Sequence, residues 1–163
     1  MMAGLRMGTV DYKQSAGATA EVVSGVFSVK NAVLNGSVTG SGVLALSGNV
    51  EIAADSRIAP AAVTLAENLS VTCGGAPASA APISSTAAIA LPEAMTVTFD
   101  AAVDPWTYPL FASTAGLTGS AAGWTSVVKA DGKVRERWTV DFVQTGTALS
   151  ANICRPGFLL IFK

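Results

Sequence analysis

The sequence predicts an all-β protein whose short strands stack as a parallel β-solenoid, and three observations lead to this prediction. Glycine recurs every few residues with β-branched and leucine side chains between, as in VTGSGVLALSGNVEIAAD at 38–55. Segments of similar pattern recur at the spacing of one solenoid rung. Charged residues make up only 13% of the 163 residues, about half the share of roughly 25% that is typical of globular domains.

The composition fits one domain with its own core, or a run of stacked repeats. Half of the residues are hydrophobic and the net charge is −1, whereas disordered chains carry high net charge and few β-branched residues. Proteins that bind nucleic acid usually show a basic stripe. None is visible in this sequence, so we expect no nucleic-acid partner. The composition is typical of a β-rich scaffold outside the cell.

The repeated segments begin after a lead-in of low structural signal at 1–20. Three of them align: GVFSV at 25–29, GVLAL at 42–46 and AAVTL at 61–65. The distances between their starting positions fit one rung of a solenoid, in which inward side chains stack on their equivalents in the next rung. We therefore expect Val26, Leu44 and Val63 to stack inside, and we place the solenoid at 21–100.

Small residues form the predicted corners between strands. Glycine and asparagine supply the positive φ that a sharp bend needs, and Asn35-Gly36 is such a signal. The Pro/Ala/Ser-rich segment 74–88 is predicted to be an irregular loop, because Pro77 and Pro82 interrupt it. The alternative fold that these patterns leave open is an antiparallel β-sandwich with Gly-rich turns.

The final part of the chain, 101–163, is predicted to be an aromatic-rich β cap. Its clearest element is a hairpin at 124–143, in which Asp131-Gly132 is the dipeptide favoured by type I′ turns. Much of the protein's charge lies around this hairpin, at Lys129, Lys133, Arg135, Glu136 and Arg137. Charged side chains on a terminal strand hinder further strand pairing at an open sheet edge, so we expect this hairpin to close the stack.

The chain lacks the residue types that most catalytic and metal sites require. The chain has no histidine, which excludes Ser-His-Asp and Cys-His nucleophiles and zinc sites built on Cys and His. Asp100 and Asp104 are interpreted as a turn pair before Pro105, since glycosidase carboxylates need a cleft and a raised pKa. No phosphate-binding glycine loop is present. We expect no enzymatic activity, no cofactor and no metal.

Three groups of residues remain as candidate sites. Cys73 and Cys154 either form the disulfide of an exported protein or are two buried free thiols. Trp106 and Tyr108 either form a platform for stacking glycans or plug the core. A possible assembly strand ends the chain, and its residues are Phe158, Leu159, Leu160, Ile161 and Phe162.

The C-terminal strand has a predicted partner and the chain has a predicted location. An open strand at the N-terminal end of one copy could accept the 158–162 segment of a neighbour by β-augmentation. No run reaches the roughly 18 to 20 apolar residues of a membrane span, so we expect no transmembrane segment. Nor does a continuous apolar stretch precede Asp11. A surface protein would then have lost its leader, or the chain belongs to a longer one.

Three stretches together resemble a known family. They are GSGVLALSG at 40–48, MTVTFDAAVDPWTYPLFASTAGLTG at 95–119 with Trp124 after it, and ICRPGFLLIFK at 153–163. Over roughly 36–163 the chain resembles the C-terminal end of passenger regions in bacterial proteins with autotransporter-associated β-strand repeats. Trp106 stands where the family's closing G-x-Y-x-L segment has its glycine. The resemblance implies a right-handed parallel β-helix displayed outside the cell, and it implies no catalytic residue.

The predicted function is therefore that of a non-enzymatic, secreted or cell-surface structural protein acting in display, adhesion or self-assembly. Its expected partner is a further copy, in a homo-oligomer or filament, or a surface ligand. Two alternatives stay open. A phage or virion surface module would share the composition, and a carbohydrate-binding module would need exposed Trp106, Trp124 or Tyr108.

Overall fold

The chain folds entirely into β-structure. The computed structural model describes residues 10–75, 80–102 and 106–157, with 59% of residues in strands and no helix in the described part. Its strands in chain order are β1 Val10–Lys13, β2 Ala18–Glu21, β3 Val26–Leu34, β4 Gly36–Thr39, β5 Val43–Ile52, β6 Arg57–Ile58, β7 Ala62–Leu65, β8 Leu69–Cys73, β9 Ile83–Ser85, β10 Ile89–Ala90, β11 Met95–Phe99, β12 Trp106–Ser113, β13 Leu117–Thr118, β14 Thr125–Ala130, β15 Lys133–Val134, β16 Thr139–Gln144 and β17 Ala148–Cys154. The all-β class is as predicted.

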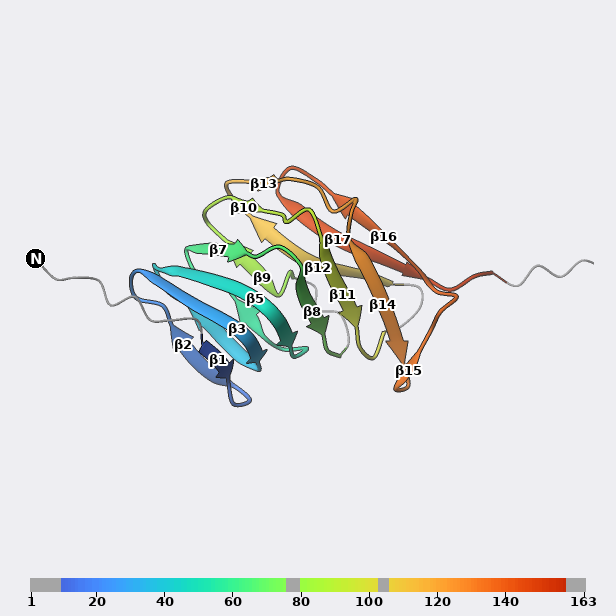
Figure 1. Cartoon of the computed structure of the whole chain (residues 1–163), viewed down its shortest axis with the longest axis horizontal. Helices are drawn as coiled ribbons and strands as arrows, with labels where there is room; N and C mark the ends of the chain where they lie inside the picture. Colours follow the sequence, from blue (N-terminus) through green and yellow to red (C-terminus); the bar gives the residue numbers. More distant parts are fainter. Residues whose placement is uncertain (1–9, 76–79, 103–105, 158–163) are drawn as a thin grey trace, which may run out of the picture.

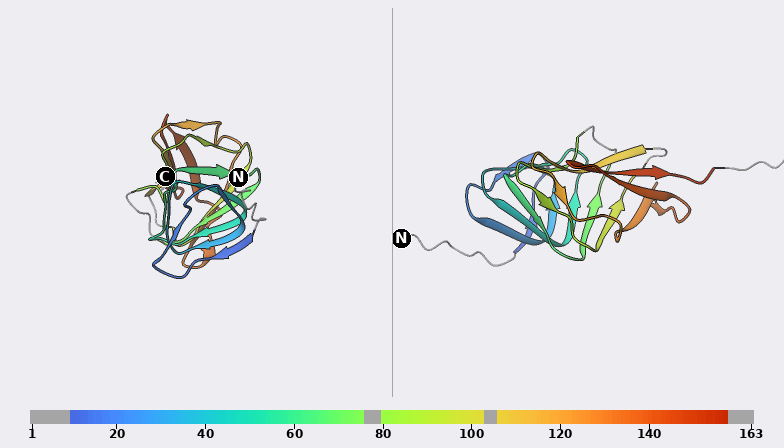
Figure 2. Two further views of the ribbon diagram at one scale, coloured as in Figure 1. Left: turned by 90° about the vertical axis from the view of Figure 1, so that its left-hand side faces the viewer. Right: turned by 90° about the horizontal axis from the view of Figure 1, so that it is seen from above.

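Two large mixed sheets, neither of them closed, contain most of these strands. The first, sheet A, has the order β1-β3-β5-β8-β11-β14-β15, with β7 also paired to β5. The second, sheet B, has the order β16-β17-β12-β9-β6-β4-β2, and β10 and β13 form a separate pair. The strands follow one another along the long axis of the molecule, from β1 and β2 at one end to β14–β17 at the other (Figures 1 and 2).

Most of the strand pairs are parallel. Among the described residues eleven of fourteen pairs are parallel, and the three antiparallel pairs all involve the C-terminal strands β14–β17. The described strands therefore do not form the antiparallel sandwich that the sequence left open. We use the name strand stack for the two large sheets together.

The three aligned sequence segments pair in the predicted register. Val26 pairs with Val43, and Val43 with Ala62, so the second residues of GVFSV, GVLAL and AAVTL lie side by side. Beyond these segments the separation along the chain between paired residues grows. The later pairs are Asn49 with Ser70, Leu69 with Met95 and Thr96 with Thr125. The later rungs are therefore longer than the early ones.

Two columns of apolar side chains, one from each large sheet, fill the space between the sheets. The column of sheet B consists of Val38, Ile58, Ile83, Phe111 and Leu149, each at most 2% exposed. The column of sheet A consists of Leu34, Ile52, Cys73, Phe99 and Val128. Burial of each large aliphatic side chain contributes roughly 1.5 to 3 kcal/mol. These columns are the core on which the stack depends.

One predicted core residue points the other way. Val26 is 57% exposed, whereas Leu44 and Val63 are buried as predicted. The residue in register with Leu44 and Val63 is Phe27, which packs against the core. Successive side chains of a strand point to opposite faces, so an error of one residue moves a side chain from the core to the surface.

The segments predicted to be a lead-in and a loop both contain strands. In the lead-in, β1 pairs with β3 and β2 begins a pair with β4, and Tyr12 contacts Phe27 edge to face at 5.4 Å. In the predicted loop, β9 joins sheet B because Ile83 packs between Ile58 and Phe111. In each of these two segments, the packing of one apolar side chain, Tyr12 or Ile83, accounts for the strand that forms.

The predicted hairpin forms, but its second strand is short. Asp131 and Gly132 both have positive φ, 52° and 70°, as a type I′ turn requires. Only two residues of β15 pair back onto β14. The rest of the predicted strand leaves sheet A and becomes β16, which pairs with β17 in sheet B, since Phe142 there reaches Trp124.

Candidate functional site at the two ends of the strand stack

Among the described residues, the two ends of the stack present strand edges without a neighbour. At the N-terminal end, β1 and β2 are the last strands of sheets A and B. At the C-terminal end, β15 and β16 hold the same positions. An unpaired edge exposes a row of backbone N–H and C=O groups that can pair with another chain. These ends are therefore the candidate functional surfaces.

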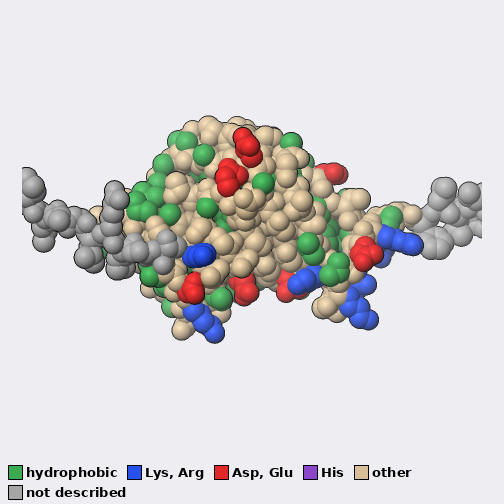
Figure 3. All heavy atoms as spheres, viewed as in Figure 1, with side chains coloured by type: hydrophobic (Ala, Val, Ile, Leu, Met, Phe, Trp, Pro, Cys, Tyr) green, Lys and Arg blue, Asp and Glu red, His purple; other side chains and the backbone are tan. Residues whose placement is uncertain are grey.

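The N-terminal end exposes three large apolar side chains. Val10, Val23 and Val26 are 38%, 66% and 57% exposed, and they are half of the large exposed hydrophobic residues in the described part of the chain. Val23 and Val26 flank a bend at Gly25, whose φ is +71°. In Figure 3 hydrophobic side chains gather over this end, on the left. We call Val10, Val23 and Val26 the N-terminal patch.

A polar side chain closes the core column of sheet A at this end. Gln14 follows Lys13, the partner of Val33, and so stands beside Leu34. It is 4% exposed, and its amide nitrogen donates to the carbonyls of Ala18 and Ser37, each at 2.8 Å. Its Oε1 is buried without a hydrogen-bond partner. Gln14 thus shields the column, while no described strand pairs with the outer edges of β1 and β2.

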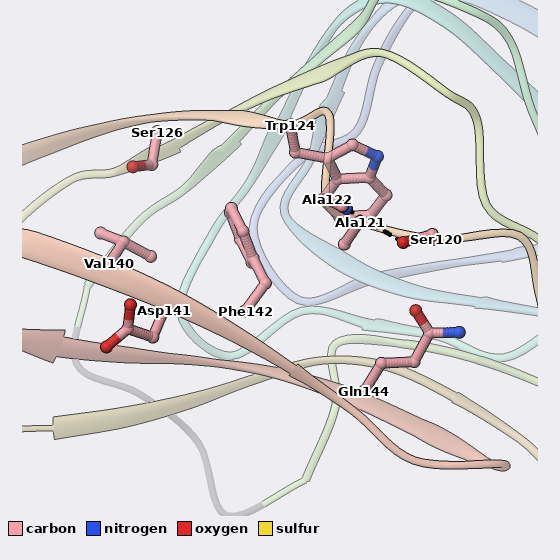
Figure 4. A pocket seen from close by; sticks show the side chains of 9 residues that line it. All are labelled: Ser120, Ala121, Ala122, Trp124, Ser126, Val140, Asp141, Phe142 and Gln144. Atoms are coloured by element: carbon pink, nitrogen blue, oxygen red, sulfur yellow. Dashed lines mark hydrogen bonds between the residues drawn. The ribbon is translucent and has the colours of Figure 1, made fainter.

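The C-terminal end contains a pocket of about 380 Å³ between the start of β14 and β16 (Figure 4). Its walls are residues 120–122, Trp124 and Ser126 on one side and residues 140–142 and Gln144 on the other. Figure 4 shows Phe142 pointing from β16 toward Trp124, and the two rings meet edge to face at 5.5 Å. We call this the C-terminal pocket.

Trp124 fixes the shape of this pocket. Its ring also contacts Phe111 of the core at 6.0 Å, and its Nε1 donates to the Pro92 carbonyl at 2.9 Å. On the opposite wall the Gln144 amide donates to the Gly119 carbonyl at 3.1 Å. Ser126 stands in register with the buried Val97 but is itself exposed. The pocket is therefore the uncovered end of the core.

The two parts of the molecule differ in charge. Residues 106–157 carry five basic and three acidic side chains, a net charge of +2. Residues 10–75 and 80–102 carry three basic and seven acidic side chains, a net charge of −4. Figure 3 shows Lys and Arg gathered near β15. The C-terminal end thus carries positive charge relative to the rest of the stack.

The predicted glycan platform does not form. Tyr108 is only 4% exposed; its hydroxyl donates to the Gly75 carbonyl at 3.1 Å and its ring packs on Phe99 at 5.0 Å. Burial, and to a lesser degree the nearby Cys73, raises the pKa of Tyr108. Trp106 at the start of β12 is 50% exposed. Trp106 lies two residues before Tyr108 and so on the same side of β12, but Tyr108 is buried in the core and only Trp106 is accessible.

The predicted disulfide is also not formed. Cys73 and Cys154 are both free. Cys73 lies in the core column of sheet A, while Cys154 is exposed at the end of β17. The alternative of two buried thiols therefore holds for Cys73 alone.

The other candidate residues lie at turns or outside the described part. Asp100 accepts a hydrogen bond from the Ala101 backbone at 3.1 Å, and Ala101 has a φ of +57°, which fits the predicted turn. Asp104 and the predicted assembly strand at 158–162 fall outside the described residues. The C-terminal pocket itself was not predicted, because no local sequence pattern links Trp124 to Phe142.

The two cysteines are expected to differ in reactivity toward a thiol reagent. Burial raises the pKa of Cys73 to about 12, and the thiolate is the reactive form, so Cys73 should not react in the native protein at pH 8. Cys154 should react at once. Titration with a chromogenic disulfide reagent should give one thiol per chain in buffer and two in denaturant. A Cys154→Ser variant that still reacts in buffer would contradict the burial of Cys73.

No family model, no characterised protein and no solved structure matches this chain. None of the described segments forms a helix of the length and hydrophobicity that a membrane crossing requires. Within 10–75, 80–102 and 106–157, no three His, Cys, Asp or Glu side chains gather in a group that could hold a metal ion.

Proposed function

We propose that the chain forms the capped end of a right-handed parallel β-helix and is a non-enzymatic structural protein outside the cell, acting in display, adhesion or assembly. The observation that carries the proposal is the continuous parallel stacking of strands around one core. The chain passes alternately through the two large sheets, from β3 to β4, β5 and β6. One passage through both sheets, such as β3 followed by β4, is one rung of the proposed β-helix.

Two further features support the β-helix. Crossovers between parallel strands of one sheet are right-handed in about 98% of cases, which favours the right-handed form. Polar side chains also bridge neighbouring rungs at corners: Ser56 Oγ donates to the Leu34 carbonyl at 2.7 Å, and Ser113 Oγ to the Ala87 carbonyl at 2.8 Å. Such bridges satisfy backbone groups where the strands end.

The location outside the cell rests on composition and on the family resemblance. The low charge and the many small and β-branched residues suit a rigid scaffold, and the passenger-like motifs belong to proteins displayed on bacterial surfaces. A protein of this kind acts through its shape and its edges. A role in display, adhesion or assembly therefore follows from the same features.

Limited digestion with trypsin tests the proposal, since a structural protein outside the cell has to resist proteases. We expect cleavage at the exposed cap residues Lys133 and Arg137, and no cleavage after Arg57, whose backbone pairs with that of Ser37 in β4. Exposed tips are the preferred sites of nicking. The denatured chain, cut at every site, is the control. Cleavage after Arg57 as fast as after Arg137 would contradict the parallel stacking of the strands.

A further inference from the structure

The free strand edges at the two ends of the stack differ in their protection against pairing with another chain. Short strands, charged side chains and irregular pairing all hinder such contacts. Strand β1 has four residues, two of them charged, and its pairing with β3 shifts between Val10 and Tyr12. Strands β2 and β15 have four and two residues. In contrast, β16 has six residues that pair with β17 without irregularity and carry a single charge, at Asp141. Its free edge is therefore the least protected of the four.

The backbone groups on the free edge of β16 belong to its even-numbered residues. In an antiparallel pair, alternate residues direct both their N–H and C=O groups toward the neighbouring strand. The Thr145 N–H donates to the Ala148 carbonyl at 2.8 Å, and the same alternation directs the odd-numbered residues of β16 toward β17. The even-numbered residues point away from β17 and have no backbone partner in the described part of the chain. They are Val140, Phe142 and Gln144.

This edge is complementary to itself. Two copies of β16 can pair antiparallel about a two-fold axis that passes between their Phe142 residues, with Val140 of each copy opposite Gln144 of the other. All of these residues then direct their N–H and C=O groups toward the other copy, and the inner faces of both sheets lie on the same side. A register centred on Asp141 would instead place two carboxylates opposite each other, which is unfavourable.

The C-terminal pocket leaves room for the second aromatic ring. Directly opposite residues of an antiparallel pair place their side chains on one face of the sheet, and Phe142 lines the pocket (Figure 4). A cavity of about 150 Å³ holds a benzene ring, whereas the pocket measures about 380 Å³. Phe142 of a second copy would therefore extend the ring contact between Phe142 and Trp124 and cover the end of the core.

We propose that two copies of this chain form a dimer in which β16 pairs with β16 and the two B sheets become one. The inference rests on the proposed role in assembly and names its partner. On the outer face, Asp141 of each copy lies opposite Val143 of the other, and both side chains are exposed in the single chain. Each copy has one β16 edge, so the two-fold axis closes the contact and the assembly ends at the dimer.

Substitutions of Gln144 in the full chain test the edge. Gln144→Pro removes an N–H that points to the free edge, a position at which edge strands tolerate proline. Gln144→Ala is the matched control, because both variants lose the side-chain bond to the Gly119 carbonyl and only alanine keeps the N–H. Circular dichroism checks the folding of both variants. Size-exclusion chromatography with light scattering, over a range of concentrations, measures the mass.

We expect the wild type and Gln144→Ala to pass from monomer to dimer as the concentration rises. The two-fold axis means that Gln144→Pro removes two hydrogen bonds from the dimer, so its dissociation constant should be about tenfold higher or more.

Substitutions of Val143 test the register independently. Val143→Asp places a carboxylate opposite Asp141 of the other copy, whereas Val143→Lys places an ammonium group there. Val143 is 44% exposed, so both variants should fold. The dimer of Val143→Asp should have a dissociation constant at least about tenfold higher than that of Val143→Lys, and the difference should shrink in concentrated salt.

A wild type that stays monomeric overturns the inference, and so does a mass that grows beyond the dimer. Equal dissociation constants for Gln144→Pro and Gln144→Ala would exclude pairing through this edge. Equal constants for Val143→Asp and Val143→Lys would exclude the proposed register. If trypsin still spares Arg57 in a monomeric wild type, the dimer alone is wrong and the proposed β-helix survives.

Discussion

Replacing Leu44 with Asp is expected to unfold the protein at room temperature. Leu44 is 1% exposed and stacks between Phe27 and Val63. An unpaired charge at such a site costs several kcal/mol, and the whole stability of a domain is about 5 to 15 kcal/mol. Circular dichroism with a urea titration should show loss of the β signal or a midpoint shifted strongly downward.

Val26→Asp is the matched control for Leu44→Asp. Val26 lies on a neighbouring strand, one position out of register, and is 57% exposed. Exposed substitutions usually change the free energy of unfolding by about 0.5 kcal/mol or less. The two variants add the same charge and differ in the side of the sheet that receives it. Equal urea midpoints for both would refute the inward stacking of Leu44.

The register of the strand stack can be predicted from the sequence only where the repeated segments are short and evenly spaced. The first two offsets can be read from GVFSV, GVLAL and AAVTL because those segments share their alternation. Farther along, paired strands such as β8 and β11, or β11 and β14, lie at longer and unequal separations, and no fixed period remains to be found. Strand β9 is only a short element in a Pro/Ala/Ser-rich segment, so Ile83 alone marks it.

At the ends of the stack, too, only the features that depend on neighbouring residues could be predicted. The turn at Asp131-Gly132 was predictable, because a type I′ turn depends on two adjacent residues. The division of the following strand into β15 and β16 was not, since it depends on β17, which comes later in the chain. The candidate site lies where these distant pairings end. The free edges and the pocket therefore became visible only in the fold.

The glycines of the repeat are expected to differ greatly in their tolerance of a side chain. Gly40→Ala should lower the free energy of unfolding by about 3 kcal/mol or more, because backbone strain and overpacking combine. Its φ of +115° is one that side chains rarely adopt, and a Cβ there would overlap the carbonyl oxygen of Val22. Each of the two costs is roughly 1 to 3 kcal/mol. The Gly40 carbonyl also accepts a hydrogen bond from Ala61 at 2.8 Å, which keeps the backbone from shifting.

Gly25→Ala separates the two costs. Gly25 has a φ of +71° and nothing within 4 Å of a Cβ built on it, so only the left-handed conformation is penalised, by about 1 to 2 kcal/mol. Urea midpoints of the two variants and the wild type should fall in the order wild type, Gly25→Ala, Gly40→Ala. The difference between the two variants measures how closely neighbouring strands approach. If Gly40→Ala were as stable as Gly25→Ala, the strand after Gly40 would not lie against Val22, and the stacking of the first rungs would be wrong.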